Sequence, residues 1–321
     1  MSRPKVLLTR RWPEAVERRL AADYDLTLNH GDGPLSFETL SEALTQYDAI
    51  CPAVVDSITA DLVARDGIRT RILANYGVGV NHIDIEACRA RGIAVTNTPD
   101  VLTEATAETA LTLMLMIARR AGEGERQVRA GEWKGWGTTK LLGTTLVGKT
   151  LGVVGFGRIG QAMARMAHRA LGMPVLYSSR RPIAPEIEAE TGARWRPLDD
   201  LLAEADVVTL HCPGGPETQN LINAERLRLM KPSAFLINTA RGSVVDEAAL
   251  EAALRTGVIA GAGLDVFVNE PDVPPGFLEL ENVVLFPHLG SATVETRDAM
   301  GHRAADNLDA FFAGKLPQDL L

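Results

Sequence analysis

The sequence predicts an α/β protein made of two domains, each built on a doubly wound parallel sheet. Its 321 residues, of which 46% are hydrophobic and 23% are charged, are enough to form two cores. Short apolar runs alternate with helical patterns from the N-terminus, and a second alternating series starts at Thr150. A glycine-rich turn follows the first strand of this second series. Such alternation is typical of parallel strands covered by helices on both faces.

The first series contains short apolar runs that predict strands. These are Lys5–Thr9, Leu26–Leu28, Ala49–Cys51, Arg71–Ala74 and Ile93–Thr96. Segments with a helical spacing of apolar residues lie between them. These are Glu14–Ala22, Ser36–Leu44, Ala60–Arg65 and Ile85–Arg91. The first part of the chain therefore predicts one domain with a parallel sheet.

The segment from Thr103 to Arg120 predicts a long helix that is apolar nearly all round. A helix of this kind is normally buried on several sides, so we expect it to bridge the two domains. The glycine-rich segment Gly131–Lys149 contains Trp133 and Trp136. It predicts an arm or loop rather than a core element.

The second series has the same organisation as the first. Its predicted strands are Leu151–Phe156, Val175–Ser178, Asp206–Leu210, Ala234–Asn238, Ala260–Asp265 and Val283–Phe286. Its predicted helices begin near Arg158, Leu198, Asn223 and Asp246, and a last helix spans Thr293 to Phe312. The chain contains no internal repeat and no low-complexity tract that would suggest another architecture.

Charge and cysteine content argue against several classes of protein. A net charge of −8 argues against a general nucleic-acid-binding surface. The three cysteines have neither metal-ligand spacing nor the pattern of a disulfide framework, which fits a reducing compartment and no bound metal. The N-terminus does not resemble a signal peptide, and the most apolar stretch, Ala110 to Ala118, is too short to cross a bilayer. We therefore expect a cytoplasmic protein with no membrane partner.

The run LGVVGFGRIG, residues 151 to 160, carries a dinucleotide-binding signal. Gly155 permits the tight turn, Gly157 lets the backbone approach a pyrophosphate, and Gly160 allows close helix–strand packing. Arg158 and Ile159 start the next helix, whose positive end favours the phosphates. A glycine-rich turn without a ligand is the alternative, but the strand before the motif and the helix after it favour a nucleotide.

The end of the next strand predicts which dinucleotide is bound. An NAD enzyme carries an acidic residue about 20 positions after the motif, which binds the ribose 2′-hydroxyl. This chain instead has Ser178, Ser179, Arg180 and Arg181. Because arginine pairs with a phosphate through two hydrogen bonds, the segment favours NADPH over NADH. A solvated basic turn is the alternative.

Three polar residues follow predicted strands near the end of the second series. Arg241 lies in NTARG, Glu270 in NEP and His288 in PHLGSAT. Ligands of open α/β sheets bind at the carboxyl ends of the strands. Singly, each residue has a structural explanation as an ion-pair partner, the end of an element or a core side chain. Together they predict a keto-acid reductase in which arginine binds the carboxylate, histidine donates a proton and glutamate orients the histidine.

An ordered set of segments resembles the D-isomer-specific 2-hydroxyacid dehydrogenase family. The segments are AETALTLML, LGVVGFGRIG, HCP, NTARGSVVDEAAL, GAGLDVF, NEP and PHLGSAT. The resemblance covers essentially the whole chain and places the family's catalytic trio at Arg241, Glu270 and His288. It implies a Rossmann cofactor domain, residues 101–287, inserted into a flavodoxin-like substrate domain, which consists of residues 1–100 and 288–321.

Within this family the chain is most similar to the glyoxylate/hydroxypyruvate reductases, whose substrate loop resembles ANYGVGVNHID, residues 74 to 84. The resemblance implies that the backbone amides of Val78 and Gly79 bind the substrate carboxylate and that Ser291 contributes to the substrate site. Asn81 stands where many relatives have Asp. The implied substrate is a small 2-keto or 2-hydroxy acid.

The resemblance also extends the cofactor site and predicts an assembly. Residues implied to contact the cofactor are Thr106, Cys212, Pro213, Ala240 and Asp265, with Thr106, Ala240 and Asp265 near the nicotinamide. A homodimer is implied, with the segment 103–149 near its interface. Trp136 is expected to cap the partner's site, with plain packing as the equal alternative for both Trp133 and Trp136.

Other reactions on the same fold remain as alternatives. Formate dehydrogenases pair the histidine with Gln, which Glu270 argues against, and phosphite dehydrogenases have Lys where this chain has Val78. Phosphoglycerate dehydrogenases often have an extra regulatory domain, which we do not expect here because the sequence ends soon after residue 312. A binding protein that senses dinucleotides would keep the trio, so a turnover assay must separate it from an enzyme.

Overall fold

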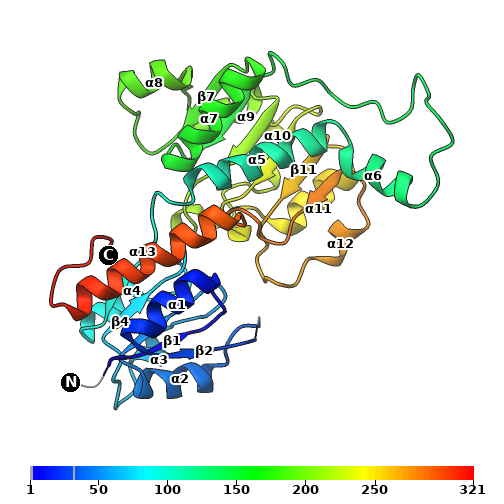
Figure 1. Cartoon of the computed structure of the whole chain (residues 1–321). Coiled ribbons are helices and arrows are strands. Elements are labelled where there is room, and N and C mark those ends of the chain that lie inside the picture. The colour runs from blue at the N-terminus through cyan, green and yellow to red at the C-terminus, as the bar shows by residue number, and fades with distance from the viewer. Residues whose placement is uncertain (1–2, 32) are drawn as a thin grey trace. The chain divides into compact units, whose positions relative to one another are not determined.

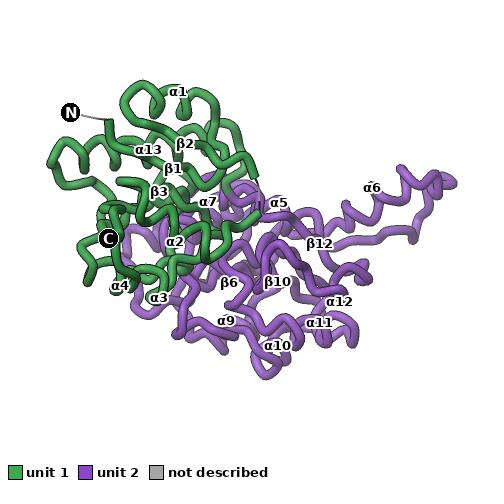
Figure 2. Tube along the Cα trace, turned by 90° about the horizontal axis from the view of Figure 1, so that it is seen from below, with its two compact units in different colours: residues 1–102, 291–321 green, residues 103–290 purple. Residues whose placement is uncertain are grey.

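The computed structural model describes residues 3–31 and 33–321 (Figure 1). The chain forms two compact units, shown in different colours in Figure 2. Unit 1 consists of Met1–Leu102 and Ser291–Leu321, and unit 2 is Thr103–Gly290. Each unit has one parallel sheet with helices on both faces, as the sequence predicts.

Unit 1 contains a five-stranded parallel sheet. Its strands are β1 (Lys5–Leu8), β2 (Asp25–Leu28), β3 (Ala49–Cys51), β4 (Ile72–Ala74) and β5 (Ala94–Thr96). Its helices are α1 (Glu14–Asp23), α2 (Phe37–Gln46), α3 (Ala60–Val63), α4 (Ile85–Ala90) and α13 (Val294–Phe312). The strand order β2-β1-β3-β4-β5 is that of a flavodoxin-like sheet.

Alternate residues of the unit 1 strands face two separate cores, because successive side chains of a strand point to opposite faces. Val6 and Leu8 of β1 belong to the core that includes residues of α1 and α13. Leu7 belongs to the core on the other face, with residues of α2, α3 and α4. Burial on both faces explains why these strands appear in the sequence as continuous apolar runs.

Unit 2 contains a seven-stranded parallel sheet. Its strands are β6 (Leu151–Val154), β7 (Val175–Ser178), β8 (Ala193–Trp195), β9 (Val207–Leu210), β10 (Phe235–Asn238), β11 (Gly261–Leu264) and β12 (Val283–Leu285). Its α-helices are α5 (Thr103–Ala118), α6 (Ala121–Arg129), α7 (Arg158–Leu171), α8 (Pro185–Thr191), α9 (Leu198–Glu204), α10 (Ala224–Leu229), α11 (Glu247–Arg255) and α12 (Pro275–Leu278). The strand order β12-β11-β10-β9-β6-β7-β8 is a Rossmann sheet extended by one strand, with its switch point between β6 and β9.

Helix α5 packs tightly onto this sheet and onto α7. Leu113 and Met114 are fully buried, as expected of a helix that is apolar nearly all round. The helix can approach β11 closely because that strand contains glycine. A Cβ atom on Gly263 would lie only 2.9 Å from the Cβ of Leu113.

Three helices and one strand of unit 2 were absent from the sequence prediction. These are α6, α8, α12 and β8. Helix α6 has no buried residue and the other three elements bury one residue each, so none shows a clear apolar pattern. The segment that follows α6, through Lys149, forms no helix or strand and projects from the body of unit 2 (Figures 1 and 2).

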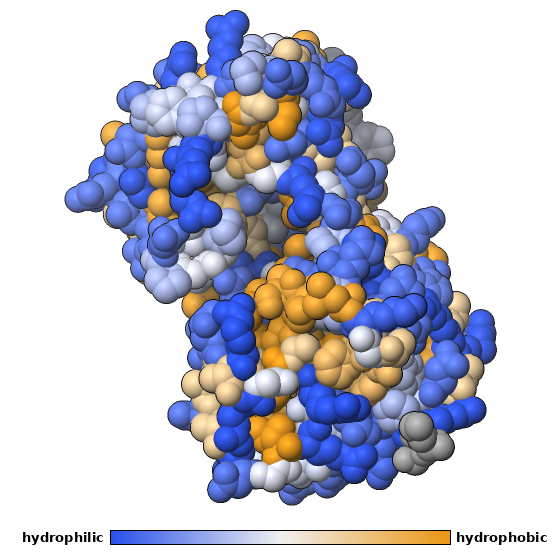
Figure 3. Space-filling view, turned by 90° about the vertical axis from the view of Figure 1, so that its left-hand side faces the viewer, coloured by the Kyte–Doolittle hydropathy of each residue, from blue (hydrophilic) through white to orange (hydrophobic). Residues whose placement is uncertain are grey.

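One side of the molecule is largely hydrophilic, with apolar patches between the polar side chains (Figure 3). Within the described ranges, no helix combines the length and apolar character needed to span a bilayer.

Candidate active site

The three predicted catalytic residues all lie in unit 2, after neighbouring strands of one sheet. Arg241 follows β10, Glu270 follows β11 and His288 follows β12. Because the carboxyl ends of parallel strands meet at one edge, the three residues share that edge of the sheet. The structure brings Glu270 and His288 into direct contact, with 2.7 Å between Glu270 Oε2 and His288 Nδ1.

The Glu270 carboxylate is held from two sides. Its Oε1 accepts a hydrogen bond of 3.0 Å from the backbone N–H of Phe267, while its Oε2 meets the His288 ring. Burial alone would raise the pKa of Glu270. The hydrogen bond and charge of His288, the Phe267 amide and the charge of Arg241 outweigh burial and lower that pKa. An ionised Glu270 accepts a hydrogen bond from the Nδ1–H of the ring, which leaves Nε2 as the nitrogen able to exchange a proton with a ligand.

Asn238, the last residue of β10, shapes the turn that carries Arg241. Its side-chain oxygen accepts from the Ala240 N–H at 3.0 Å, and its amide nitrogen donates to the Arg241 carbonyl at 2.9 Å. The Arg241 guanidinium donates to the Ala240 carbonyl at 2.7 Å. Burial lowers the pKa of Arg241 while the charge of Glu270 opposes this shift, and a guanidinium remains charged at neutral pH. Arg241 therefore supplies a partly buried cation.

Asp265 holds the backbone around His288. The Asp265 carboxylate accepts from the N–H of Leu289 at 2.6 Å and of Gly290 at 2.8 Å, and its carbonyl accepts from the His288 N–H at 3.0 Å. His288 has a φ of 56°, a left-handed conformation that costs a non-glycine residue roughly 1–2 kcal/mol. Burial raises the pKa of Asp265, although the two amides and the charge of His288 oppose it. The three hydrogen bonds keep His288 in this conformation.

Glu247 supports the loop that carries Glu270, and sequence reasoning missed this role. Its Oε1 accepts from the Val268 N–H at 2.9 Å. Burial and then the charge of Glu270 raise the pKa of Glu247, against the Val268 hydrogen bond. The loop also packs closely on Gly242, where an added Cβ would lie 2.0 Å from the Phe267 carbonyl carbon. An acidic residue in the first turn of α11 suggests only helix stabilisation, so the sequence carried no separate signal.

The glycine motif forms a cradle at the start of α7. Gly155 has a φ of 87°, and an added Cβ there would lie 2.4 Å from the Cys212 backbone nitrogen. At Gly160 an added Cβ would lie 2.3 Å from the Gly155 carbonyl oxygen. At Gly157, by contrast, no described atom lies within 4 Å of an added Cβ. The tight turn thus exposes Gly157 and the helix N-terminus at Arg158 and Ile159, which fits the approach of a pyrophosphate.

The serine–arginine segment lies at the end of β7. Ser178 ends the strand, and the Ser179 hydroxyl donates to the Arg181 carbonyl at 2.6 Å. The Arg180 side chain is 87% exposed and lies 3.3 Å from the carboxylate of Glu217. Exposed ion pairs contribute little free energy, so this pair leaves Arg180 able to exchange partners.

The HCP segment follows β9 and lies against Gly155. The His211 ring is half-buried, with Nε2 2.9 Å from the Thr209 hydroxyl, and loss of hydration lowers its pKa to about 3. Burial raises the pKa of the Cys212 thiol to about 11, so it remains protonated at neutral pH. The part of this sheet edge that Cys212 and Pro213 form is therefore uncharged.

The remaining predicted ligand-binding residues divide between the two units. Thr106 of α5 and Ala240 belong to unit 2, and both are buried. The side chain of Thr106 lies beside Gly290, where its Cγ2 would be 3.5 Å from an added Cβ. Val78, Gly79 and Ser291 belong to unit 1.

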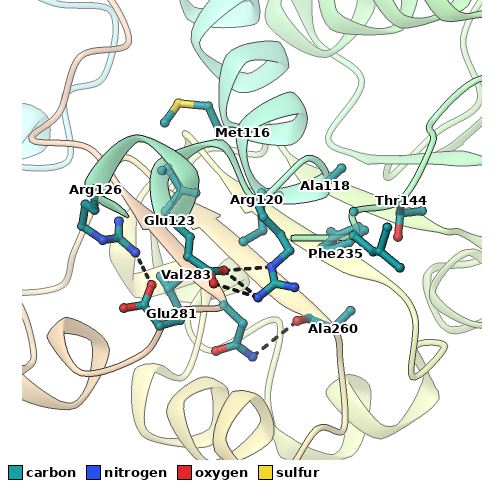
Figure 4. A pocket seen from close by; sticks show the side chains of 16 residues that line it. Met116, Ala118, Arg120, Glu123, Arg126, Thr144, Phe235, Ala260, Glu281 and Val283 are labelled. Carbon is teal, nitrogen blue, oxygen red and sulfur yellow. Dashed lines mark hydrogen bonds and ion pairs between the residues drawn. The ribbon is translucent and has the colours of Figure 1, made fainter. Parts of the chain in front are cut away.

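A cavity of about 310 Å³ lies elsewhere in unit 2, where strands begin (Figure 4). Phe235, the first residue of β10, and Val283, the first residue of β12, line it together with residues of α5, α6 and the projecting segment. Arg120 pairs with Glu123 at 2.8 Å, and Arg126 pairs with Glu281. The catalytic trio instead follows the carboxyl ends of the strands, so this cavity is separate from the trio.

Comparison with known proteins settles the family. Residues 111–290 match the model of the D-isomer specific 2-hydroxyacid dehydrogenase, NAD binding domain. The chain belongs to the D-isomer specific 2-hydroxyacid dehydrogenase family. It is an NAD(P)-dependent dehydrogenase, and the family resemblance of its ordered motifs is confirmed.

This dehydrogenase is similar to relatives along its whole length. It is 47% identical to the glyoxylate reductase of Thermococcus onnurineus and 46% identical to that of Pyrococcus furiosus. Both alignments cover 99% of this chain, with 96% of the first relative and 95% of the second.

Solved structures share the fold of this dehydrogenase. The TT0316 protein of Thermus thermophilus superposes with a TM-score of 0.91 at 44% identity, covering 99% of both chains. The NADPH-dependent glyoxylate/hydroxypyruvate reductase of Sinorhizobium meliloti, in complex with NADP and malonate, gives a TM-score of 0.88 at 37% identity. That alignment covers 100% of this chain and 97% of the other.

Proposed function

We propose that this dehydrogenase reduces small 2-keto acids, glyoxylate and hydroxypyruvate among them, to 2-hydroxy acids, and prefers NADPH to NADH. The observation that carries the proposal is the contact of His288 with an ionised Glu270 at the sheet edge that also carries Arg241. A proton donor at this edge can protonate the carbonyl oxygen of a keto acid, and a cation can bind its carboxylate. Relatives named glyoxylate reductase support the substrate class.

In the proposed reaction, Arg241 binds the substrate carboxylate and polarises the carbonyl. His288 donates the Nε2 proton to the carbonyl oxygen, while Glu270 keeps the ring oriented through Nδ1 and stabilises the imidazolium. NADPH, when bound, supplies the hydride that reduces the carbonyl carbon. One hydride and one proton convert the ketone or aldehyde to an alcohol. Asp265 and Glu247 keep the two catalytic loops in place through backbone hydrogen bonds.

The proposed cofactor site follows the sheet edge from the glycine motif. The amides at Gly157, Arg158 and Ile159 would hold the pyrophosphate, and Arg180 and Arg181 the 2′-phosphate. Further contacts are proposed from residues of the strand-end loops and α5. These are Gly155, Gly160, Ser178, Ser179, Cys212, Pro213, Thr106, Ala240 and Asp265. The carboxamide contact proposed for Asp265 would add to the backbone hydrogen bonds it already accepts.

The remaining substrate contacts are proposed for unit 1. The Val78 and Gly79 amides would bind the carboxylate, and Ser291 would contribute to the pocket. The division proposed for the chain is that unit 1 supplies the substrate domain and unit 2 the cofactor domain.

Steady-state assays of the purified protein test this function. Glyoxylate, hydroxypyruvate and larger 2-keto acids are each compared with NADPH and NADH. The proposal expects turnover of the two small acids, with a higher kcat/KM for NADPH. Dinucleotide binding with no turnover of any 2-keto acid would instead favour a nucleotide-sensing protein.

A homodimer is part of the proposal. Trp133 and Trp136, on the projecting segment, are 63% and 86% exposed, and an exposed apolar segment of this kind usually marks an interaction surface. Sedimentation equilibrium should give twice the 34.5 kDa mass of the chain. A monomer at micromolar concentration would contradict this assembly. The three cysteines are free and buried, which supports the proposed cytoplasmic location.

A further inference from the structure

We propose that Asn75 and Asn97 are positioning residues that aim the Val78 and Gly79 N–H groups at the substrate carboxylate. The two asparagines lie at the carboxyl ends of β4 and β5, which are neighbouring strands of unit 1. Both are buried, with 1% and 9% of their surface exposed. The inference rests on the proposed function, because it specifies how the loop would recognise a carboxylate.

The side chains of the two asparagines bind consecutive carbonyl groups of the loop. Asn75 Nδ2 donates to the carbonyl of Gly77 at 2.9 Å and to that of Gly79 at 3.0 Å. Asn97 Nδ2 donates to the carbonyl between them, that of Val78, at 2.9 Å. Three successive peptide groups are therefore held by two side chains.

Holding these carbonyls also fixes the direction of the amides. In a trans peptide the C=O and N–H bonds point in opposite directions. The Gly77 carbonyl shares its peptide group with the Val78 N–H, and the Val78 carbonyl shares its group with the Gly79 N–H. Carbonyls turned toward buried asparagines therefore turn the two N–H groups away from the interior. Among the described residues neither N–H has an acceptor, so both can bind an anion.

His82 fixes the orientation of the Asn75 amide. Its Nε2 lies 2.9 Å from Asn75 Oδ1. Since Asn75 Nδ2 donates both of its hydrogens to carbonyls, Oδ1 is the atom that faces the ring, and a carbonyl oxygen only accepts. The proton of this hydrogen bond must therefore be on His82 Nε2. The ring prevents the Asn75 amide from flipping, which would place its oxygen against the carbonyls of Gly77 and Gly79.

The backbones of both asparagines are anchored to the rest of unit 1. The Asn75 N–H donates to the Thr96 carbonyl at 2.9 Å, which ties it to β5. The Asn97 carbonyl accepts from the buried side chain of Asn307 in α13 at 3.3 Å. These hydrogen bonds attach the loop to the sheet and to a long helix, so the direction of the loop amides is set before a substrate binds. Preorganised donors lose little entropy on binding, which favours affinity.

Leucine substitutions test this arrangement, because the leucine side chain branches at Cγ as that of asparagine does but carries no amide. Asn75→Leu and Asn97→Leu are compared with the wild type for the KM of glyoxylate and, in the NADPH-loaded enzyme, the calorimetric Kd of oxamate. We expect both constants to rise about 10- to 100-fold, the usual worth of hydrogen bonds to a charged group. NADPH affinity should stay within about twofold, since the loop lies in the other unit.

Two further variants separate positioning from general damage to the fold. Asn29→Leu is the matched control, because the Asn29 side chain donates to the Thr9 carbonyl at 3.0 Å in another loop of unit 1. It should leave the oxamate Kd unchanged. His82→Gln keeps an N–H donor for Asn75 Oδ1 whereas His82→Leu removes it, so glutamine should retain tighter oxamate binding than leucine.

The outcomes distinguish this inference from the proposed function. Wild-type protein that binds oxamate but turns over no 2-keto acid would contradict the function alone. Folded Asn75→Leu and Asn97→Leu proteins with a wild-type oxamate Kd would overturn the inference, as would wild-type protein that binds no oxamate. If both variants fail to fold, ¹⁵N spectra of the wild type decide. Oxamate should move the Val78 and Gly79 amide resonances, and unmoved resonances under saturation would overturn the inference.

Discussion

Glu270 and His288 share a hydrogen bond of 2.7 Å between Oε2 and Nδ1, although 18 residues separate them in the chain. The contact lowers the pKa of Glu270 against the effect of burial, so the carboxylate stays ionised from neutral pH to below its ordinary value of 4.5. A carboxylate that is always charged in the working range stabilises an imidazolium beside it. The pair should therefore control the pH dependence of reduction.

The first prediction concerns that pH dependence. Glu270→Gln keeps a hydrogen-bond acceptor for Nδ1 but removes the negative charge that favours the imidazolium. Reduction needs a protonated His288, so activity should be lost at lower pH than in the wild type. The high-pH limb of the kcat/KM profile should move to lower pH, whereas His288→Ala should flatten the limb and cost roughly 10²–10⁴-fold in rate. An unmoved limb in Glu270→Gln with intact cofactor affinity would leave Glu270 a structural role only.

The second prediction concerns the carboxylate anchor. Arg241→Ala should abolish most turnover, and Arg241→Lys should restore only part of it, because lysine lacks the planar fork that binds a carboxylate through two hydrogen bonds. Cofactor affinity, measured by quenching of protein fluorescence, should survive in both variants. A near-wild-type kcat/KM in Arg241→Ala would show that the substrate anchor has been misassigned.

The third prediction concerns cofactor choice and compares substitutions on the two sides of the Arg180–Glu217 ion pair. Replacing Arg180 and Arg181 together with alanine should narrow the kcat/KM gap between NADPH and NADH, since charge-assisted phosphate contacts are worth about 1.5–3 kcal/mol each. Glu217→Gln should widen the gap, because Glu217 lies 3.3 Å from the Arg180 guanidinium and its charge opposes a phosphate there. The kcat/KM values for NADH provide the internal control. Equal use of both cofactors by the wild type would contradict the assignment of this segment.

The fourth prediction concerns stability in acid. Burial lowers the pKa of His211 from 6.5 to about 3 in the folded protein, whereas an unfolded chain gives the ring its ordinary value. Between these values only the unfolded state binds the proton, so the stability that His211 contributes is complete above pH 6.5 and falls as the pH decreases toward 3. The free energy of unfolding should fall by up to about 1.4 kcal/mol per pH unit more in the wild type than in His211→Asn.

Urea unfolding at several pH values between 6.5 and 4.5 measures the difference in slope for His211. His30→Asn, at an exposed position, is the matched control and should keep the wild-type slope. Parallel slopes for the wild type and His211→Asn would show that the ring is protonated in the folded state as readily as in the unfolded one.

The sequence by itself determined the features that depend on local pattern. Apolar runs mark strands buried on both faces, and the spacing around Gly155 and Gly157 marks the turn into α7, because burial and backbone conformation restrict residue type at each position. The common edge of Arg241, Glu270 and His288 was also predictable, since the carboxyl ends of parallel strands must meet. Ordered motifs sufficed for the family as well.

Only the tertiary structure decided which side chains meet across that edge. The Glu247 hydrogen bond to the Val268 amide, the Asp265 hydrogen bonds to the amides after His288, and the asparagine contacts of the substrate loop join residues without a shared sequence pattern. Elements such as α6 and β8 also escaped prediction, because α6 has no buried residue and β8 buries only Ala193, so neither shows an apolar pattern. Such contacts depend on strand order and loop conformation, which arise when distant segments pack together. Local residue preferences constrain each segment but not its partner.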